Sequence, residues 1–425
     1  MRRWLFGIAL LITSLSLNLF SQTKPGLDTT TFVVMGEGLA AGMANYGLSS
    51  ESQRYSFPSL AAAQMQTAFP QPLIQPPGVG DVIGYPGQEV RLQTYPQGSV
   101  RQYYQEGAAE APPLFVLNLS VPGLTLADSL SMRPVMPIAQ KNMKQTVFNL
   151  LLGFPQLFID NVPQWTQFEY AKAMFPTMSM IELGYYEVLD AAVTGDLSRL
   201  PDPTSFGNMY ATIVTGLRGL QSQVIVTTIP NPLDTGYFST PAYAGTVTFS
   251  IPGVIPIAYH LTSQDYVTRN GLLAISNQFA NQTIGPLPAG SIMTAATAAN
   301  LTAAVNALNS QIVKTAQNNG AVVYDLNGYL HSVRVAGATA GSTRVTANYL
   351  GGFYSLDGIY PSPTGHALIA NDVLRFLNAT YQKSFSMVDV SSIDGSTPST
   401  QVRVPIVEPH TFRSLRLPEP GGTQQ

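Results

Sequence analysis

The chain has 425 residues, a formal net charge of −3 and only 11% charged residues, a length sufficient for one large domain or two. It contains no cysteine, which excludes disulfides, thiol catalysis and cysteine-bound zinc. Its weak charge gives no electrostatic footprint for a nucleic-acid partner, so none is expected.

The N-terminus has the pattern of a secretory signal peptide. Two arginines precede an apolar run from Trp4 to Phe20, and a small residue follows at Ser21. The run is shorter than a comfortable membrane span. We predict a signal peptide over residues 1–21 and export to the periplasm, envelope or exterior of a bacterium, with no stable membrane span after cleavage. An uncleaved membrane anchor is the alternative.

Residues 31–42, TFVVMGEGLAAG, read as a buried strand that ends in glycines and opens a helix. Such a turn places reactive groups at the carboxyl edge of a parallel sheet. Gly36, Gly38 and Gly42 approximate a dinucleotide-binding fingerprint, but the third glycine comes one position late. Residues 52–60 would also make a poor second strand. We therefore expect no cofactor here.

The rest of the chain alternates strands with helices. Residues 50–110 are rich in Pro, Gly and Gln and predict an irregular surface loop. Apolar runs predict further strands over 113–123, 178–183, 223–230 and 321–326. Helical periodicity predicts helices over 138–159 (alternatively a lid over an apolar site), 165–175, 205–222, 295–318 and 361–383.

This order predicts one doubly wound α/β domain over residues 22–384 with a five-stranded parallel sheet. Within it, residues 232–293 form an expected insertion whose stretch TVTFSIPGVIPIAY suggests a small hairpin or lid. Residues 385–425 are rich in Ser, Thr and Pro and predict a tail that is a linker, disordered, or an extended strip on the domain.

Four blocks of the chain resemble, in order, those of the GDSL/SGNH hydrolases. They are 36–39 (GEGL, for G-D-S-L), 117–123 (LNLSVPG), 183–187 (LGYYE, for G-x-N-D) and 357–371, which begins DGIYPS, for D-x-x-H-P. The resemblance implies a flavodoxin-like sheet and a lineage of ester-cleaving lipases and esterases that use no metal or cofactor.

The departures from these blocks are chemically decisive. The resemblance places the nucleophile at Gly38 and the base at Tyr360, while Asp357 keeps the position of the acid. Glycine has no attacking atom, and a tyrosine of ordinary pKa is a poor base at neutral pH. The implied oxyanion-hole positions are Gly38, Gly123 and Tyr186, where tyrosine replaces asparagine and Glu187 follows. The sequence therefore predicts that the triad is lost.

Two catalytic alternatives remain open from the residues. Relocated groups could come from Ser120, Ser355, Ser362 and His366, which lie near the blocks. A carboxylate pair, of the kind that glycosidases use, could come from Glu37, Glu187 and Asp357. The remaining histidines, His260, His331 and His410, are scattered, so no metal site is expected.

Three tyrosines, Tyr185, Tyr186 and Tyr360, are expected at the mouth of this site. They could plug it, or form an amphipathic platform for an ester, an acyl chain or a sugar ring. The ligand-contacting set would be Glu37, Gly38, Gly123, Tyr185, Tyr186, Glu187, Asp357 and Tyr360. We predict an exported, non-catalytic ligand-binding or envelope-associated protein; the alternatives are an esterase or lipase with relocated residues and a structural protein with a plugged cleft. Whether it has a protein partner is left open.

Overall fold

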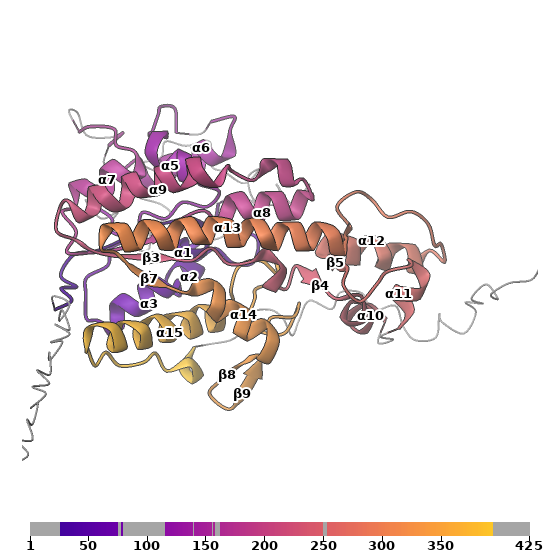
Figure 1. Cartoon of the computed structure of the whole chain (residues 1–425). Coiled ribbons are helices and arrows are strands. Elements are labelled where there is room, and N and C mark those ends of the chain that lie inside the picture. The colour runs from indigo at the N-terminus through magenta and orange to yellow at the C-terminus, as the bar shows by residue number, and fades with distance from the viewer. Residues whose placement is uncertain are drawn as a thin grey trace, which may run out of the picture.

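The computed structural model describes residues 26–74, 78–79, 115–138, 140–154, 156–157, 162–249 and 253–393 (Figure 1). The predicted signal peptide, most of the predicted loop beyond residue 74 and the predicted tail beyond residue 393 lie outside these ranges. Across the described residues, no helix is both long enough and apolar enough to cross a membrane.

A parallel sheet forms the centre of the molecule. Its strands, in spatial order, are β1 (Phe32–Gly36), β2 (Met178–Glu182), β3 (Gln223–Thr227) and β7 (Val322–Tyr324). The first two are buried along their whole length, which suits a sheet covered by helices on both faces. The register sets Gly36 opposite Glu182, so the glycine turn and an acidic side chain share one edge.

The predicted fifth strand is irregular. Residues 116–121 run parallel to β1: the Val34 amide donates to the Leu117 carbonyl, and the Leu119 amide donates back to the Val34 carbonyl, both at 2.9 Å. Only one isolated bridge, Val34 to Asn118, results. The Asn118 side chain accepts from the Ser120 amide, a local bond that competes with a regular ladder. The sheet thus has four regular strands, not the five predicted.

Counting residues 116–121 as the second segment, the spatial order along the sheet is 2-1-3-4-5, the flavodoxin-like order. In that order the chain reverses direction of travel at β1, and ligands bind beside such a switch point. The glycine turn that follows Gly36 lies at this switch point.

Helices cover both faces of the sheet. In Figure 1, α7, α8, α9 and α13 lie on one side of the sheet, and α3, α14 and α15 lie on the other. The helices up to residue 218 are α1 (Gly38–Ala41), α2 (Ser50–Gln53), α3 (Phe57–Gln64), α5 (Leu126–Ser131), α6 (Met143–Leu152), α7 (Gln167–Ala173), α8 (Tyr185–Thr194), η2 (Leu197–Arg199) and α9 (Pro203–Arg218). The later ones are α13 (Ala295–Asn319), α14 (Leu326–Ala336), α15 (Pro363–Tyr381) and η4 (Val390–Ser392).

The first part of the predicted loop, residues 50–64, is helical, so the loop prediction is wrong there. Pro58 lies in the first turn of α3, where its missing amide and fixed backbone angle do no harm. Phe57, Ala61 and Ala62 are fully buried, and α3 packs against α15. Proline and glutamine content masked a short buried helix.

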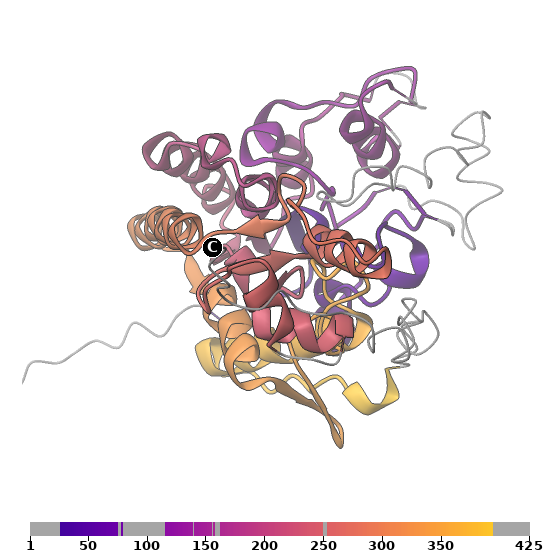
Figure 2. The same ribbon diagram turned by 90° about the vertical axis from the view of Figure 1, so that its right-hand side faces the viewer.

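The insertion forms a small lobe, which faces the viewer in Figure 2. Its elements are η3 (Pro232–Asp234), β4 (Phe238–Ser239), α10 (Pro241–Phe249), α11 (Val254–Ala258), β5 (Tyr266–Thr268), α12 (Arg269–Ala280) and β6 (Ile292–Met293). The three strands form an antiparallel sheet. The expected hairpin is wrong, because α10 and α11 occupy most of that stretch. The lobe has its own core, which includes Ile255, Val267 and Ile275.

The C-terminal part adds a hairpin that the sequence did not predict, β8 (Ala338–Ala340) with β9 (Thr343–Val345). The described start of the tail lies as an extended strip on α15. Asn371 on that helix exchanges two hydrogen bonds with the backbone of Val388, and Asn378 does the same with Phe385.

Candidate functional site

The four sequence blocks converge at the carboxyl edge of the sheet. The turn after β1 carries Glu37 and Gly38, and the segment beside β1 ends at Gly123. The loop before α15 reaches the same edge, because its Tyr360 hydroxyl lies within hydrogen-bonding distance of Glu37. The start of α8 reaches it as well, because the Tyr186 ring lies near Gly123. The fold therefore assembles the predicted site from segments more than 300 residues apart.

Tyr360 fills the space beside Gly38. A Cβ atom placed on Gly38 would lie 2.7 Å from the Tyr360 hydroxyl oxygen and 2.8 Å from two ring carbons. The Tyr360 side chain is only 2% exposed. Any larger residue at position 38 would therefore have to displace a buried aromatic ring.

Glu37 is fully buried against backbone amides. Its Oε1 accepts from the Leu39 amide at 2.8 Å, and its Oε2 accepts from the Tyr360 hydroxyl at 3.2 Å. Burial raises the pKa of Glu37 to about 7, against the opposing effect of hydrogen bonds from the amides of Leu39, Gly38 and Gly123. The two glycine amides at implied oxyanion positions thus lie close enough to the Glu37 carboxyl group to lower its pKa.

Glu182 is a site residue that the sequence analysis missed. It ends β2, is 1% exposed, and its Oε2 accepts from the amides of Glu37 at 3.2 Å and Ala40 at 3.3 Å. Burial, and then the neighbouring charge of Glu37, raise its pKa well above the ordinary value. An acidic residue at the end of an otherwise buried strand was the available signal. Gln167, also missed, donates to the carbonyls of Gly36 and Leu119.

The Asp357 carboxyl group accepts hydrogen bonds from three backbone amides and so orients the loop before α15. Oδ1 accepts from Ile359 at 2.8 Å and from Tyr360 at 2.9 Å, and Oδ2 accepts from Tyr46 at 3.3 Å. The side chain is fully buried, and this burial raises its pKa. These bonds fix the backbone from which the Tyr360 ring extends toward Gly38.

The other residues that were predicted at the mouth of the site differ in their exposure. Tyr185 is only 2% exposed, as is Tyr360. Burial of Tyr185 and the nearby carboxyl groups, among them Glu37, raise the pKa of its hydroxyl, so it lies buried beside the site. Tyr186 is partly exposed, and its ring would contact a Cβ on Gly123 at 3.7 Å. Glu187 lies beside it: its Oε1 accepts from the Leu126 amide at 2.7 Å, and burial raises its pKa to about 7.

Of the three serines proposed for relocated catalysis, Ser355 and Ser362 form structural hydrogen bonds, whereas the Ser120 hydroxyl is buried without a hydrogen-bond partner among the described residues. Ser355 accepts from the Asn45 amide, and Ser362 caps α15 by accepting from the Gly365 amide. Ser120 is buried at 4% exposure. His366 stacks on Phe57 with ring centroids 6.4 Å apart, and burial lowers its pKa to about 3, which keeps the ring neutral. In the described part of the chain, the His366 imidazole ring forms no hydrogen bond with the side chains of these serines.

The described residues contain no group of three or more histidine, aspartate or glutamate side chains arranged to hold a metal ion. The pair that comes nearest is His331 and Asp234, 3.1 Å apart on the surface of the lobe's base. His410 lies outside the described residues.

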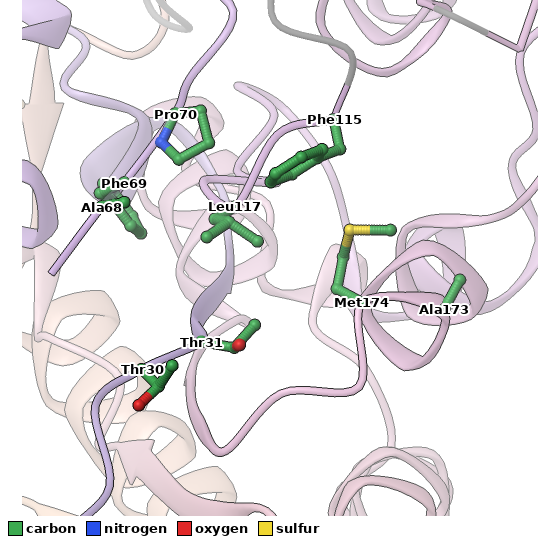
Figure 3. A pocket seen from close by; sticks show the side chains of 9 residues that line it. All are labelled: Thr30, Thr31, Ala68, Phe69, Pro70, Phe115, Leu117, Ala173 and Met174. Atoms are coloured by element: carbon green, nitrogen blue, oxygen red, sulfur yellow. The ribbon is translucent and has the colours of Figure 1, made fainter.

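A separate apolar groove of about 790 Å³ lies at the opposite, amino end of β1 (Figure 3). It is lined by Thr30, Thr31, Ala68, Phe69, Pro70, Phe115, Leu117, Ala173 and Met174. We call the site at the carboxyl end of β1, formed by Glu37, Gly38, Glu182, Asp357 and Tyr360, the Glu37 centre. The groove lies near the start of β1 and shares no residue with this centre.

Together, these features define an α/β protein with a parallel sheet in the flavodoxin-like order, whose four blocks meet at the edge where SGNH hydrolases, the class that they resemble, act on esters. No model of a known protein family matches the chain. No curated protein matches it either.

Several solved structures are similar to the chain. The psychrotrophic esterase EstA from Pseudoalteromonas sp. is 10% identical with a TM-score of 0.36, over 83% of this chain and 100% of that one. Phospholipase A1 from Streptomyces albidoflavus NA297 is 11% identical with a TM-score of 0.36, over the same shares. LAE5, an α/β hydrolase from the Lake Arreo metagenome, is 12% identical with a TM-score of 0.36, over 83% and 96%. Similarity at this level concerns the fold alone.

Proposed function

We propose that this chain is an exported, non-hydrolytic protein with an SGNH-like fold, which binds a ligand or an envelope component without cleaving it. The observation that carries the proposal is the Tyr360 ring against Gly38. At the position where the resemblance implies a nucleophile, the chain has no attacking atom and no room for one.

The electrostatics of the centre support the same function. An oxyanion hole needs backbone amides that are available to the developing negative charge. Here the Glu37 carboxyl group lies near the amides of Gly38 and Gly123, which lower its pKa, and the amides of Glu37 and Ala40 donate to Glu182. A substrate would have to displace a carboxyl group of the protein before its own oxygen could bind.

Export is the second element of the proposal. It is supported by the basic, then apolar, then small-residue order of the first 21 residues, and by the low charge of the whole chain. Secretion of the mature chain with loss of residues 1–21 would be seen by mass spectrometry of culture fractions. Recovery of the full-length chain in the membrane fraction would instead favour an uncleaved anchor.

The experiment that tests the loss of hydrolysis is turnover of short- and medium-chain nitrophenyl esters by the mature protein. The natural protein should show no turnover above buffer. A variant with Gly38→Ser, Tyr186→Asn and Tyr360→His should remain silent while Glu37 holds the amides, and should gain turnover when Glu37→Asp shortens that side chain. Gly38→Ser alone serves as the control, because residue 360 is still a tyrosine in that variant.

Turnover by the natural protein, abolished by an alanine at Ser120, Ser355 or Ser362, would overturn the proposal and establish a relocated nucleophile. The hydrogen bonds of Ser355 and Ser362 to the backbone argue against that outcome, because each hydroxyl already has a structural partner.

A further inference from the structure

A buried arginine lies at the joint between the insertion lobe and the α/β domain. Arg269 is the first residue of α12, a helix of 12 residues, and is 9% exposed. Its guanidinium carbon lies 4.5 Å from the centre of the Tyr349 ring, a cation–π contact. It also hydrogen-bonds the side chain of Tyr46, from the segment that follows α1. We call this set, Arg269 with Tyr46 and Tyr349, the Arg269 notch.

The positive charge of Arg269 lacks a counter-charge. Among the described residues, no carboxylate lies within 4.0 Å of its guanidinium, and its Nε atom is buried without a hydrogen-bond partner. Its place in the first turn of α12 is also unfavourable, since the helix dipole is positive at that end. A buried charged group without a counter-charge is unfavourable. The notch is therefore a strongly positive position that an anion would stabilise.

The backbone around the notch is held in an unusual conformation. Asn45 and Tyr46 are consecutive residues in the left-handed region, with φ of 51° and 69°. Bonds to the loop before α15 keep them there: the Tyr46 amide donates to Asp357, and its hydroxyl donates to the Leu356 carbonyl at 2.8 Å. Since that hydroxyl gives its proton to Leu356, it receives the guanidinium as an acceptor.

We infer that the Arg269 notch binds a small monoanionic carboxylate. A guanidinium offers a planar fork that matches a carboxylate in a bidentate way. One guanidinium charge balances one carboxylate charge, whereas a phosphate dianion would carry an uncompensated charge into a largely buried place. Tyr46 is partly exposed, so the notch reaches solvent on that side.

The inference rests on the proposed function in one respect: it names a ligand class for a protein that does not hydrolyse esters. It can fail separately, because its test measures binding and involves no turnover. A protein that hydrolyses esters and binds acetate would contradict the proposed function alone. A protein that hydrolyses no ester and binds no acetate would contradict this inference alone.

The test is equilibrium dialysis of radiolabelled acetate against the mature protein, at constant ionic strength set with chloride. One acetate should bind per chain. Arg269→Gln should weaken binding by more than about tenfold, because it removes a charge-assisted pair. Arg269→Lys, which keeps the charge and loses the fork, should be intermediate. Inorganic phosphate should compete more weakly than unlabelled acetate.

Arg334→Gln is the matched control. Arg334 is a partly buried arginine near the same lobe, but it already donates to Asn348 and to the Phe238 carbonyl. Its loss should leave acetate binding unchanged. If Arg269→Gln does not fold, Tyr46→Phe replaces it, and should weaken binding by about two- to tenfold through loss of one hydrogen bond.

Four results would overturn the inference. The natural protein could bind no acetate beyond the chloride control, or bind it equally well in the folded Arg269 or Tyr46 variants. Phosphate could also compete more strongly than acetate, which would replace the carboxylate class by a phosphate. Binding that is lost in Arg334→Gln as well would show a general charge effect and likewise count against the notch.

Discussion

The Glu37 centre and the Arg269 notch are linked through Tyr46, and they differ in how their buried charged groups are neutralised. In the centre, Glu37 and Asp357 are buried acids whose oxygens accept from backbone amides. In the notch, Arg269 is a buried base that forms no ion pair with any described carboxylate. Tyr46 joins the two, because its amide bonds Asp357 and its side chain bonds Arg269.

The difference follows from where strands end. Carboxyl ends of parallel strands that turn into helices present several unpaired amides, which suit carboxylates. A guanidinium needs acceptors, and the start of a helix offers donors. The carboxyl groups of the Glu37 centre therefore accept hydrogen bonds from amides of the same chain, whereas the Arg269 Nε atom has no acceptor among the described residues. Four predictions test this contrast, from the largest expected effect to the smallest.

Asp357→Ala should be the most destabilising change, because Asp357 supports both sites. It would leave the amides of Ile359, Tyr360 and Tyr46 without their acceptor, at about 1–3 kcal/mol for each buried group. We expect a loss of at least about 3 kcal/mol in the free energy of unfolding, measured by urea denaturation. Asp357→Asn, which keeps one acceptor oxygen, should lose clearly less; equal losses would contradict the role given to these bonds.

Glu37→Gln should change how stability depends on pH. Because the folded-state pKa is raised from 4.5 to about 7, the folded protein holds this proton more tightly than the unfolded chain. The stability from this group is fully present below about pH 4.5 and is lost as the pH rises through about 7, a change of about 3 kcal/mol.

The variant should therefore gain stability over the natural protein at pH 8 and show a flatter profile from pH 5 to pH 8, read from urea denaturation at each pH. Glu187, whose pKa is also raised to about 7, keeps part of the slope in the variant. Identical profiles for the two proteins would show that Glu37 is ionised at neutral pH without cost.

Gly38→Ser should destabilise the centre and leave the notch intact. The new side chain would meet the Tyr360 ring at under 3 Å, and overpacking of a core typically costs about 1–3 kcal/mol. The same substitution in a Tyr360→Ala background should cost less, since the ring is gone. A double-mutant cycle by urea denaturation measures this coupling; additive losses would mean that the ring moves aside freely.

Tyr46→Phe should have the smallest effect on stability, about 1–2 kcal/mol, because the hydroxyl's bonds to the Leu356 carbonyl and with Arg269 are lost at a partly exposed position. The pH profile of the Glu37 centre should not change, since the Tyr46 amide that bonds Asp357 remains. An altered profile would show that the two sites are coupled through this side chain, and the contrast between them would have to be redrawn.

The sequence predicted the site in outline but not its chemistry. Gly38, Gly123, Asp357 and Tyr360 could be placed at one sheet edge because strand-then-glycine patterns and block order are local features. Glu182 and Gln167 could not be assigned, since their partners are backbone amides and carbonyls of distant segments.

The sequence by itself determined the α/β order, three of the four further parallel strands and the long helices, since runs of apolar residues with period 2 or 3.6 encode them. Tertiary structure alone decided that residues 50–64 are helical, that residues 116–121 miss a regular ladder, and that the insertion is a lobe with its own core. It also decided that Tyr360 covers Gly38 and that Arg269 forms no ion pair within the described part of the chain. Such facts depend on contacts between segments hundreds of residues apart, where shape and hydrogen-bond partners override local propensity.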